Sequence, residues 1–406
     1  MAQEFTRTGP RPLPIHLGTL STTWMSSRAA LPFLKNVCAN WKPDLKTEAL
    51  ALCEEIENYS QDAFTAALDA EAFLRSQSFQ AGVKAYHAHP YKRDVDDPDP
   101  ILHDGNTKLL DYGGPKDGPV MLAVPSLINR AYVLDLNQKR SFMRTMAQKG
   151  IRSFLVDWGN VEESEKNLTL EDYILTRLNN CVEEIVRLTG KPVCLMGYCM
   201  GGVLTTAFTI LNPDNVAALI LLATPWDFHA GHGTHTKIIS ATKLQLESTV
   251  NSFGVLPIDV IQSLFAAIDP YQILKKFTDF AQLKQTSAAA QKFVAMEDWV
   301  NDGVPLSGPV AKECLFNWYV ENKPGQTQWE MDGHLINPQE ITCPTLLFIP
   351  ERDRIVPKDS ALALSKAIPN AQTKLVSAGH IGMVTGRKAA STLYTPLSKW
   401  LLSQNI

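Results

Sequence analysis

The segment around Cys199 carries the clearest chemical signature of the chain. Residues 197–202 read GYCMGG; they follow a short apolar run typical of a strand and precede a pattern typical of a helix. A nucleophile on such a sharp turn needs small neighbours, because the strained backbone leaves no room for side chains beside it. The turn would place the Cys199 sulfur at a helix N-terminus, where unpaired N–H groups favour a thiolate. We interpret Cys199 as a catalytic nucleophile; the alternative is a small buried cysteine between glycines.

Two later residues supply the groups that a cysteine nucleophile needs. Asp353 follows the apolar run 345–349, and His380 follows the next apolar run, 374–376. The order nucleophile, acid, histidine is that of the α/β-hydrolases, which carry the acid and the histidine on loops after late strands. His380 would take the thiol proton, and Asp353 would orient the imidazole. Glu351 is a weaker competitor for the position of the acid.

Backbone N–H groups near the nucleophile are candidates for an oxyanion hole. The N–H of Met200, directly after the cysteine, would point at the developing negative charge. The loop after the run 120–124 would supply a second donor, which we place at Ser126 or Leu127. The alternative for this loop is a plain strand-to-helix connection.

A cysteine in this position favours acyl transfer from a thioester. The acyl-enzyme would itself be a thioester, so its exchange with a thioester substrate is nearly thermoneutral, and transfer to an alcohol then runs downhill to an ester. Such a reaction needs a cover that excludes water. The residues alone do not name the substrate.

Composition excludes several other classes of protein. The chain has 406 residues, of which 45% are hydrophobic, with 38 Lys and Arg against 42 Asp and Glu. This balance argues against wholesale disorder and against a general polyanion binder. No run is long enough to cross a bilayer, and no apolar stretch follows Arg7 and Arg11 as a secretory signal would require. We therefore expect a cytoplasmic protein without a transmembrane segment and without a nucleic-acid partner.

Neither a metal nor a cofactor is expected. The seven cysteines form no CxxC pair, so the sequence suggests no disulfide framework and no zinc site. His229, His232 and His235 have a spacing that could ligate a metal, but no carboxylate or cysteine pattern accompanies them. A polar loop is the better interpretation of these histidines.

Short apolar runs alternate with helical patterns over much of the chain, which predicts an α/β fold with a mostly parallel sheet. The expected strands are 109–112, 120–124, 153–156, 193–196, 216–222, 345–349 and 374–376. The expected helices between and after them are 135–149, 170–189, one that starts near Gly201, and 387–402.

The places where the chain changes between purely helical patterns and alternating strand and helix patterns predict four regions. Residues 1–100 form an N-terminal helical region, and residues 101–225 form the first part of an α/β-hydrolase core. Residues 226–340 are mostly helical and form a cap inserted into the core, which residues 341–406 complete. An insertion at this point is where α/β-hydrolases carry their cap.

Several motifs resemble those of the polyhydroxyalkanoate synthases. The resembling segments are PSLINRAYVLDL (125–136), DWG (157–159), LTLEDYI (168–174), TPWDF (224–228), YVEN (319–322) and GHIG (379–382), beside the GYCMGG turn. The resemblance extends from about residue 102 to the C-terminus. It is strongest to the short synthases of classes III and IV, which work with a second subunit.

The resemblance implies a function and a set of site residues. It implies Cys199 as nucleophile, His380 as its base and Asp353 as the third member, in an acyltransferase that polymerises (R)-3-hydroxyacyl-CoA into polyester with release of CoA. It further implies a homodimer, a second synthase subunit as partner, and a place on polyhydroxyalkanoate granules. Two alternatives stay open: a cysteine-nucleophile hydrolase, such as a polyester depolymerase, esterase or thioesterase, and a non-catalytic granule-associated protein.

Overall fold

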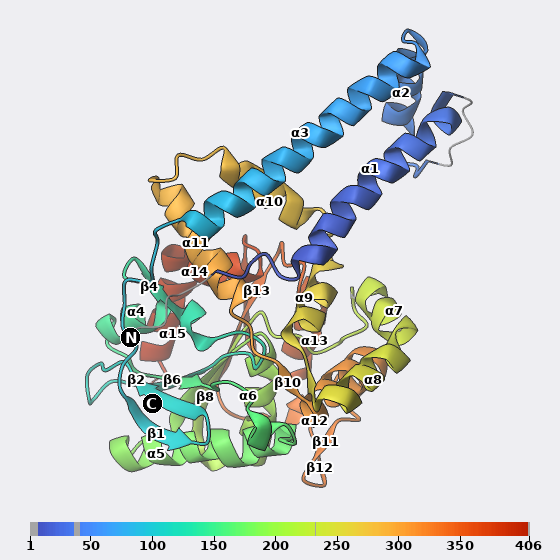
Figure 1. The fold of residues 1–406 in the computed structure, drawn as a ribbon. Coiled ribbons are helices and arrows are strands. Elements are labelled where there is room, and N and C mark those ends of the chain that lie inside the picture. The colour runs from blue at the N-terminus through green and yellow to red at the C-terminus, as the bar shows by residue number, and fades with distance from the viewer. Residues whose placement is uncertain (1–6, 36–40, 232, 405–406) are drawn as a thin grey trace. The chain divides into compact units, whose positions relative to one another are not determined.

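The computed structural model describes residues 7–35, 41–231 and 233–404 (Figure 1). Contacts between residues divide the chain into two units. One consists of Met1–Tyr91 together with Asp269–Asn301, and the other consists of Lys92–Ile268 together with Asp302–Ile406. All residues discussed so far as chemically active belong to the second unit.

The second unit is built on a sheet of eight strands within the described residues. Their spatial order is β1 (Pro100–Asp104), β2 (Thr107–Asp111), β6 (Arg152–Asp157), β3 (Val120–Val124), β7 (Val193–Tyr198), β8 (Val216–Leu222), β13 (Thr345–Pro350) and β14 (Gln372–Val376). The pairs β1–β2 and β2–β6 are antiparallel, and the others are parallel. The expected α/β class with a mostly parallel sheet is confirmed.

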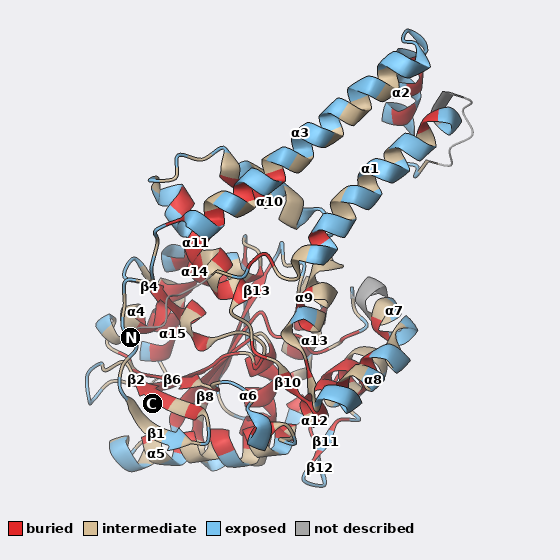
Figure 2. Cartoon of the chain, viewed as in Figure 1, coloured by how far each residue is buried: buried red, intermediate tan, exposed pale blue. Residues whose placement is uncertain are grey.

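Helices cover both faces of this sheet, so its central strands are buried throughout. Every residue of β3, β7 and β13 is buried, as parallel sheets require. The helices that follow the strands are α4 (Phe142–Gln148), η3 (Asp172–Leu178), α5 (Asn179–Thr189), α6 (Met200–Leu211), α13 (Lys358–Ala367), α14 (His380–Thr385), η7 (Ala390–Tyr394) and α15 (Thr395–Leu402). Buried residues accordingly concentrate on the strands and on α6 (Figure 2).

The chain between β8 and β13 is mostly helical, as expected. Within the second unit it contains α7 (Gly233–Ala241), α8 (Lys243–Phe253), α9 (Ile258–Ala266), α12 (Gly308–Lys312) and the π-helix η5 (Glu313–Val320). Two short antiparallel ladders accompany them: β9 (Val255–Leu256) with β10 (Leu306–Ser307), and β11 (Glu330–Met331) with β12 (His334–Leu335).

The first unit is helical and has a small aromatic core. Its helices are α1 (Leu13–Lys35), α2 (Lys46–Glu57), α3 (Gln61–Ala88), α10 (Gln272–Ala281) and α11 (Ala288–Asn301). Phe79 and Tyr86 of α3 pack edge-to-face on Phe277 of α10. The expected helical N-terminal region is therefore present, and α10 and α11 share its unit. The boundaries near residues 100, 225 and 340 stay predictions.

The helix expected over residues 135–149 is wrong in its first half. Residues Asp135–Asn137 and Arg140–Ser141 form the small antiparallel pair β4 and β5, and only α4 is helical. The cause is the buried side chain of Asp135, which accepts hydrogen bonds from Arg144, Arg93 and Tyr112. Binding three donors holds the chain extended where the apolar spacing alone suggested a helix.

No helix among the described residues is long and apolar enough to cross a membrane.

Candidate active site

Cys199 occupies a strained turn between β7 and α6. Its backbone has φ 57° and ψ −125°, an uncommon conformation for a residue with a side chain. Its N–H donates to the carbonyl of Leu222 on the neighbouring strand at 2.8 Å, which fixes the turn to the sheet. The half-buried side chain then stands at the N-terminus of α6, as the sequence predicted.

The glycines beside the cysteine are required by close backbone approach. A Cβ on Gly197 would lie 2.3 Å from the Cα of Gly202, and a Cβ on Gly201 would lie 2.0 Å from the carbonyl oxygen of Val124. Real Cβ contacts are not this short, so either side chain would force the turn open. Gly201 therefore also brings the start of α6 against the end of β3.

His380 and Asp353 form a hydrogen-bonded pair beside this turn. The imidazole Nδ1 lies 2.7 Å from Asp353 Oδ2. The second carboxylate oxygen accepts the N–H groups of Ile355 at 2.8 Å and Val356 at 2.9 Å, so the fully buried carboxylate is held from both sides. Cys199 lies close enough to the His380 imidazole to raise its pKa. The fold thus brings the three residues together in the predicted order, whereas Glu351 is exposed.

Opposing influences set the charge of His380. Burial lowers the pKa of the imidazole, but the electrostatic influence of Asp353 and Cys199 outweighs burial and raises the pKa to about 10. A carboxylate and a sulfur on either side thus favour the imidazolium at neutral pH.

Tyr198 supports the imidazole in a way that sequence reasoning did not foresee. Its ring stacks on that of His380 with centroids 5.3 Å apart and planes 25° apart. Its hydroxyl donates to the carbonyl of His380 at 3.3 Å, and burial raises the pKa of the phenol well above its ordinary value, so it stays neutral. Its only signal in the sequence was its place directly before the nucleophile.

The loop after β3 lies against the start of α6 and is held by three hydrogen bonds. Trp158 Nε1 donates to the carbonyl of Pro125 at 3.0 Å, and the N–H of Ile128 donates to Ser126 Oγ at 3.1 Å. The carbonyl of Ile128 accepts the N–H of Val304 at 2.7 Å. In the sequence Trp158 belongs to the DWG motif, and its support of this loop is not predictable from that motif.

The three predicted oxyanion donors lie around this contact. Met200 is the first residue of α6, Ser126 is half-buried, and Leu127 is buried. Among the hydrogen bonds of the described residues, none uses the backbone N–H of these three residues. The assignment of the second donor to Ser126 or Leu127 stays a prediction.

The three histidines with metal-like spacing are only partly described. His229 Nε2 donates to the carbonyl of Val320 at 3.0 Å, which ties this loop to the end of η5. His232 and the side chain of His235 lie outside the described part of the chain. The part of the chain that the structure describes contains no group of three His, Cys, Asp or Glu side chains that could hold a metal.

Comparison with known proteins gives one matching family model and several relatives. The model described as alpha/beta hydrolase fold matches residues 119–386. A poly(3-hydroxyalkanoate) polymerase subunit PhaC from Synechocystis is 30% identical over 292 residues, which cover 69% of this chain and 77% of that protein. The subunit of the same name from Allochromatium vinosum is 28% identical over 296 residues, which cover 71% of this chain and 82% of that protein.

A third relative of the same name, from Haloferax mediterranei, is longer. It is 27% identical over 313 residues, which cover 75% of this chain but only 63% of the relative. The similar region thus spans less than two thirds of that protein. It nevertheless includes most of this chain.

Proposed function

Because the chain belongs to the α/β-hydrolase fold family and, within it, to the poly(3-hydroxyalkanoate) polymerases, we propose that it polymerises (R)-3-hydroxyacyl-CoA through Cys199. The observation that carries the proposal is the chain of contacts from Cys199 to His380 to Asp353, at the turn where this fold places its nucleophile. The relatives' names support the polyester product, the resemblance of the motifs supports the acyl-CoA substrate, and the geometry supports the proposed residue roles.

The first step transfers the acyl group to the enzyme. His380 holds the proton that Cys199 releases, and the thiolate attacks the carbonyl carbon of the substrate thioester. The new sulfur–carbon bond forms while the bond to the CoA sulfur breaks, and the departing sulfur takes the proton from His380. Backbone N–H groups of Met200 and of the loop after β3 stabilise the negative charge on the oxygen. CoA leaves as a free thiol.

The second step makes the ester bond. Neutral His380 accepts the proton of the 3-hydroxyl of another acyl-CoA, and that oxygen attacks the thioester carbonyl on Cys199. The sulfur–carbon bond breaks, which returns the thiolate and the imidazolium. Asp353 stays ionised throughout and keeps the imidazole in the required orientation. Each cycle thus joins two acyl-CoA molecules and releases one CoA.

The experiment that tests this function measures two products at once. The protein is incubated with (R)-3-hydroxybutyryl-CoA while free thiol and turbid polymer are followed together. We expect both to appear. Thiol release with free hydroxy acid and no polymer would instead indicate a hydrolase on the same scaffold, and no thiol release would contradict both enzymatic functions.

Substitution of the nucleophile tests its role. We expect Cys199→Ser to lower thiol release by about 100-fold or more, because a hydroxyl is a much poorer nucleophile than a thiolate at neutral pH. Cys343→Ser is the matched control, since Cys343 is half-buried and lies before β13 rather than at the turn. Full activity of Cys199→Ser would refute the assignment.

The assembly of the protein belongs to the same proposal. The Synechocystis and Allochromatium relatives are each named a polymerase subunit. We infer that this chain acts as a homodimer, works with a second synthase subunit and remains on the granule that its product forms. Light scattering of the isolated protein and the thiol-release rate with and without a candidate second subunit test the first two statements.

A further inference from the structure

The helix α1 of the first unit exposes large apolar side chains around most of its circumference (Figure 2). Five of them are more than a third exposed: Ile15, Leu17, Trp24, Met25 and Phe33. The buried residues His16 and Leu31 lie on one side of the helix, since the 15 residues between them make about four turns. We call the exposed residues between Pro14 and Phe33 the outer face of α1.

Almost no charge accompanies these apolar side chains. Between Leu13 and Phe33 the sequence contains a single Lys, Arg, Asp or Glu residue, Arg28, and its guanidinium pairs with Asp69 of α3 at 3.2 Å. The next helix, α2, differs, because it carries four glutamates and one lysine. An exposed apolar surface of this kind indicates an interaction site, and its low charge disfavours a charged partner.

Two hydroxyl groups on the outer face of α1 are turned back toward the helix. Thr22 Oγ1 donates to the carbonyl of Gly18, and Ser26 Oγ donates to the carbonyl of Thr23 at 2.9 Å. A contact between proteins usually contains about one hydrogen bond per 100–200 Å², which requires polar groups that point outward. The outer face of α1 therefore fits an uncharged apolar material better than a protein or an anionic lipid.

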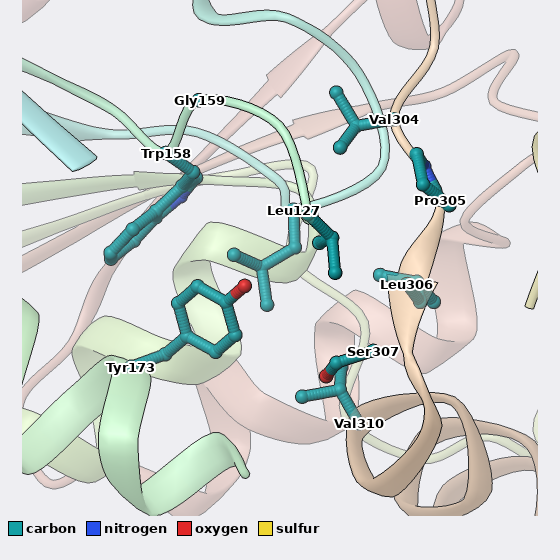
Figure 3. Close-up of a pocket in the computed structure, with 10 residues that line it drawn as sticks. Leu127, Trp158, Gly159, Tyr173, Val304, Pro305, Leu306, Ser307 and Val310 are labelled. Carbon is teal, nitrogen blue, oxygen red and sulfur yellow. The ribbon is translucent and has the colours of Figure 1, made fainter. Parts of the chain in front are cut away.

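A polyester is such a material, since its chain consists of alkyl and ester groups without charge. The pocket that Leu127, Trp158 and Leu306 line in the second unit has a volume of about 10 Å³ (Figure 3), close to the roughly 10–15 Å³ that one water molecule needs. A polymer segment does not fit there. The outer face of α1, in contrast, is open over a length of about 30 Å.

Resting on the proposed function, which supplies the identity of the product, we propose that the outer face of α1 docks on the surface of the polyester. Burial of side chains such as Trp24, Met25 and Phe33 against the polymer provides the driving force. The first unit thus anchors the enzyme to its product, while the second unit carries the chemistry.

The test uses preformed particles of poly(3-hydroxybutyrate), so that binding does not depend on turnover. Sedimentation of the particles gives the Kd of the full-length protein. We expect Gly18→Glu to weaken binding by about 10-fold or more, because a carboxylate must leave water at the contact. A Cβ on Gly18 meets nothing within 4 Å, and glutamate favours a helix more than glycine does, so the fold is kept. Gly18→Ala is the matched control and should bind as the wild type does.

A second pair of variants removes apolar area instead of adding charge. Met25→Gln combined with Phe33→Gln should also weaken binding by about 10-fold or more. Phe73→Gln combined with Leu74→Gln is the control, because these two side chains are similarly exposed but belong to α3. Equal losses in both double variants would overturn the assignment to α1.

Other occupants of the face are outcomes of the same experiments. Tighter binding to phosphatidylglycerol vesicles than to the particles would overturn the proposal, and so would a dimer, measured by light scattering, that Gly18→Glu dissociates. If the wild type makes polymer from (R)-3-hydroxybutyryl-CoA but Gly18→Glu and Gly18→Ala bind the particles equally, the docking face is wrong and the function stands. If the wild type releases no thiol but Gly18→Glu weakens binding to the particles, the function fails and the docking face stands.

Discussion

The charge of His380 is decided by neighbours that were distant in the sequence. Asp353 precedes it by 27 residues and Cys199 lies on the turn after β7, yet both influence the same imidazole. Together they raise its pKa to about 10 from the ordinary 6.5. A folded-state pKa above the unfolded value means that the folded protein binds the proton more tightly, so this proton stabilises the fold.

The pH dependence of stability follows from this sign. The stabilisation from His380 is fully present below pH 6.5 and is lost as pH rises through about 10. We expect the free energy of unfolding of the wild type to exceed that of His380→Gln most at about pH 6, and the difference to shrink at about pH 8 and again at about pH 10. Urea denaturation of both proteins at the three pH values measures it, and titrating groups that do not interact with His380 cancel in the difference. A difference that grows with pH would contradict the charge assigned here.

Motif order predicted which residues the fold brings together better than it predicted the contacts that support them. Cys199, Asp353 and His380 each follow an apolar run, so the sequence could place them at one edge of a sheet. Tyr198 supports the site by stacking on the His380 ring, and Trp158 does so by a hydrogen bond to the Pro125 carbonyl in the loop after β3. Such contacts depend on strand order and on side-chain direction, which spacing in one sequence does not encode.

At the scale of elements, β3, β6 and α6 together shape the loop that would bind the oxyanion. Trp158 follows β6 and holds the Pro125 carbonyl after β3, and Gly201 of α6 packs against the same carbonyl. The carbonyl is thereby fixed in orientation, and so is the peptide chain that continues to Ser126 and Leu127. Elements that are separate in sequence thus meet at one peptide group.

Removal of the Trp158 N–H tests this arrangement. We expect Trp158→Phe, which keeps an aromatic ring, to lower kcat by about 10- to 100-fold with a smaller change in KM, because a misplaced donor weakens the transition state more than substrate binding. Trp400→Phe is the matched control, since Trp400 Nε1 is buried and has no hydrogen-bond partner among the described residues. Equal loss in both variants would mean that ring packing, not the hydrogen bond, is responsible.

Elements with strong apolar runs were predictable, and those set by buried polar contacts were not. β3 and β8 have the predicted bounds 120–124 and 216–222. The pattern predicts a helix where β4 and β5 form a hairpin. There the buried carboxylate of Asp135 accepts hydrogen bonds from Arg93, earlier in the chain, and from Arg144, later in the chain. The spacing of apolar residues indicates which side chains are buried. It does not indicate which polar side chains will bind a buried carboxylate such as that of Asp135.

At the scale of the whole molecule, the chain builds two units with separate apolar cores. The second core joins the sheet to its helices, and the first consists of aromatic residues of α3 and α10 with Ala290 and Val294 of α11. The segment that contains α10 and α11 belongs to the first unit. It begins after Ile268, and the chain rejoins the second unit at Asp302. The sequence predicted helices in this stretch but not their partners, because their apolar faces fit any helix with a complementary face.

Because the two units have separate apolar cores, we expect a substitution in one core to destabilise the helices or strands of that unit and to spare those of the other. Phe79 is 1% exposed between Phe277 and the rest of the first core, and truncation of a buried phenylalanine costs about 3–5 kcal/mol. We expect Phe79→Ala to speed amide hydrogen exchange in α3, α10 and α11 while β7, β8 and β13 keep their protection. Hydrogen-exchange mass spectrometry resolves these segments.

Phe208→Ala provides the opposite case, because Phe208 is fully buried in α6 of the second unit. It should lower protection in β7 and β8 and spare α3. Thiol release from 3-hydroxybutyryl-CoA adds a functional measure: Phe79→Ala should retain most of it at temperatures where the sheet stays protected, since every residue of the proposed site lies in the second unit. If Phe79→Ala instead exposes the sheet as much as Phe208→Ala does, the two units unfold as one, and the first core stabilises the site as well as its own helices.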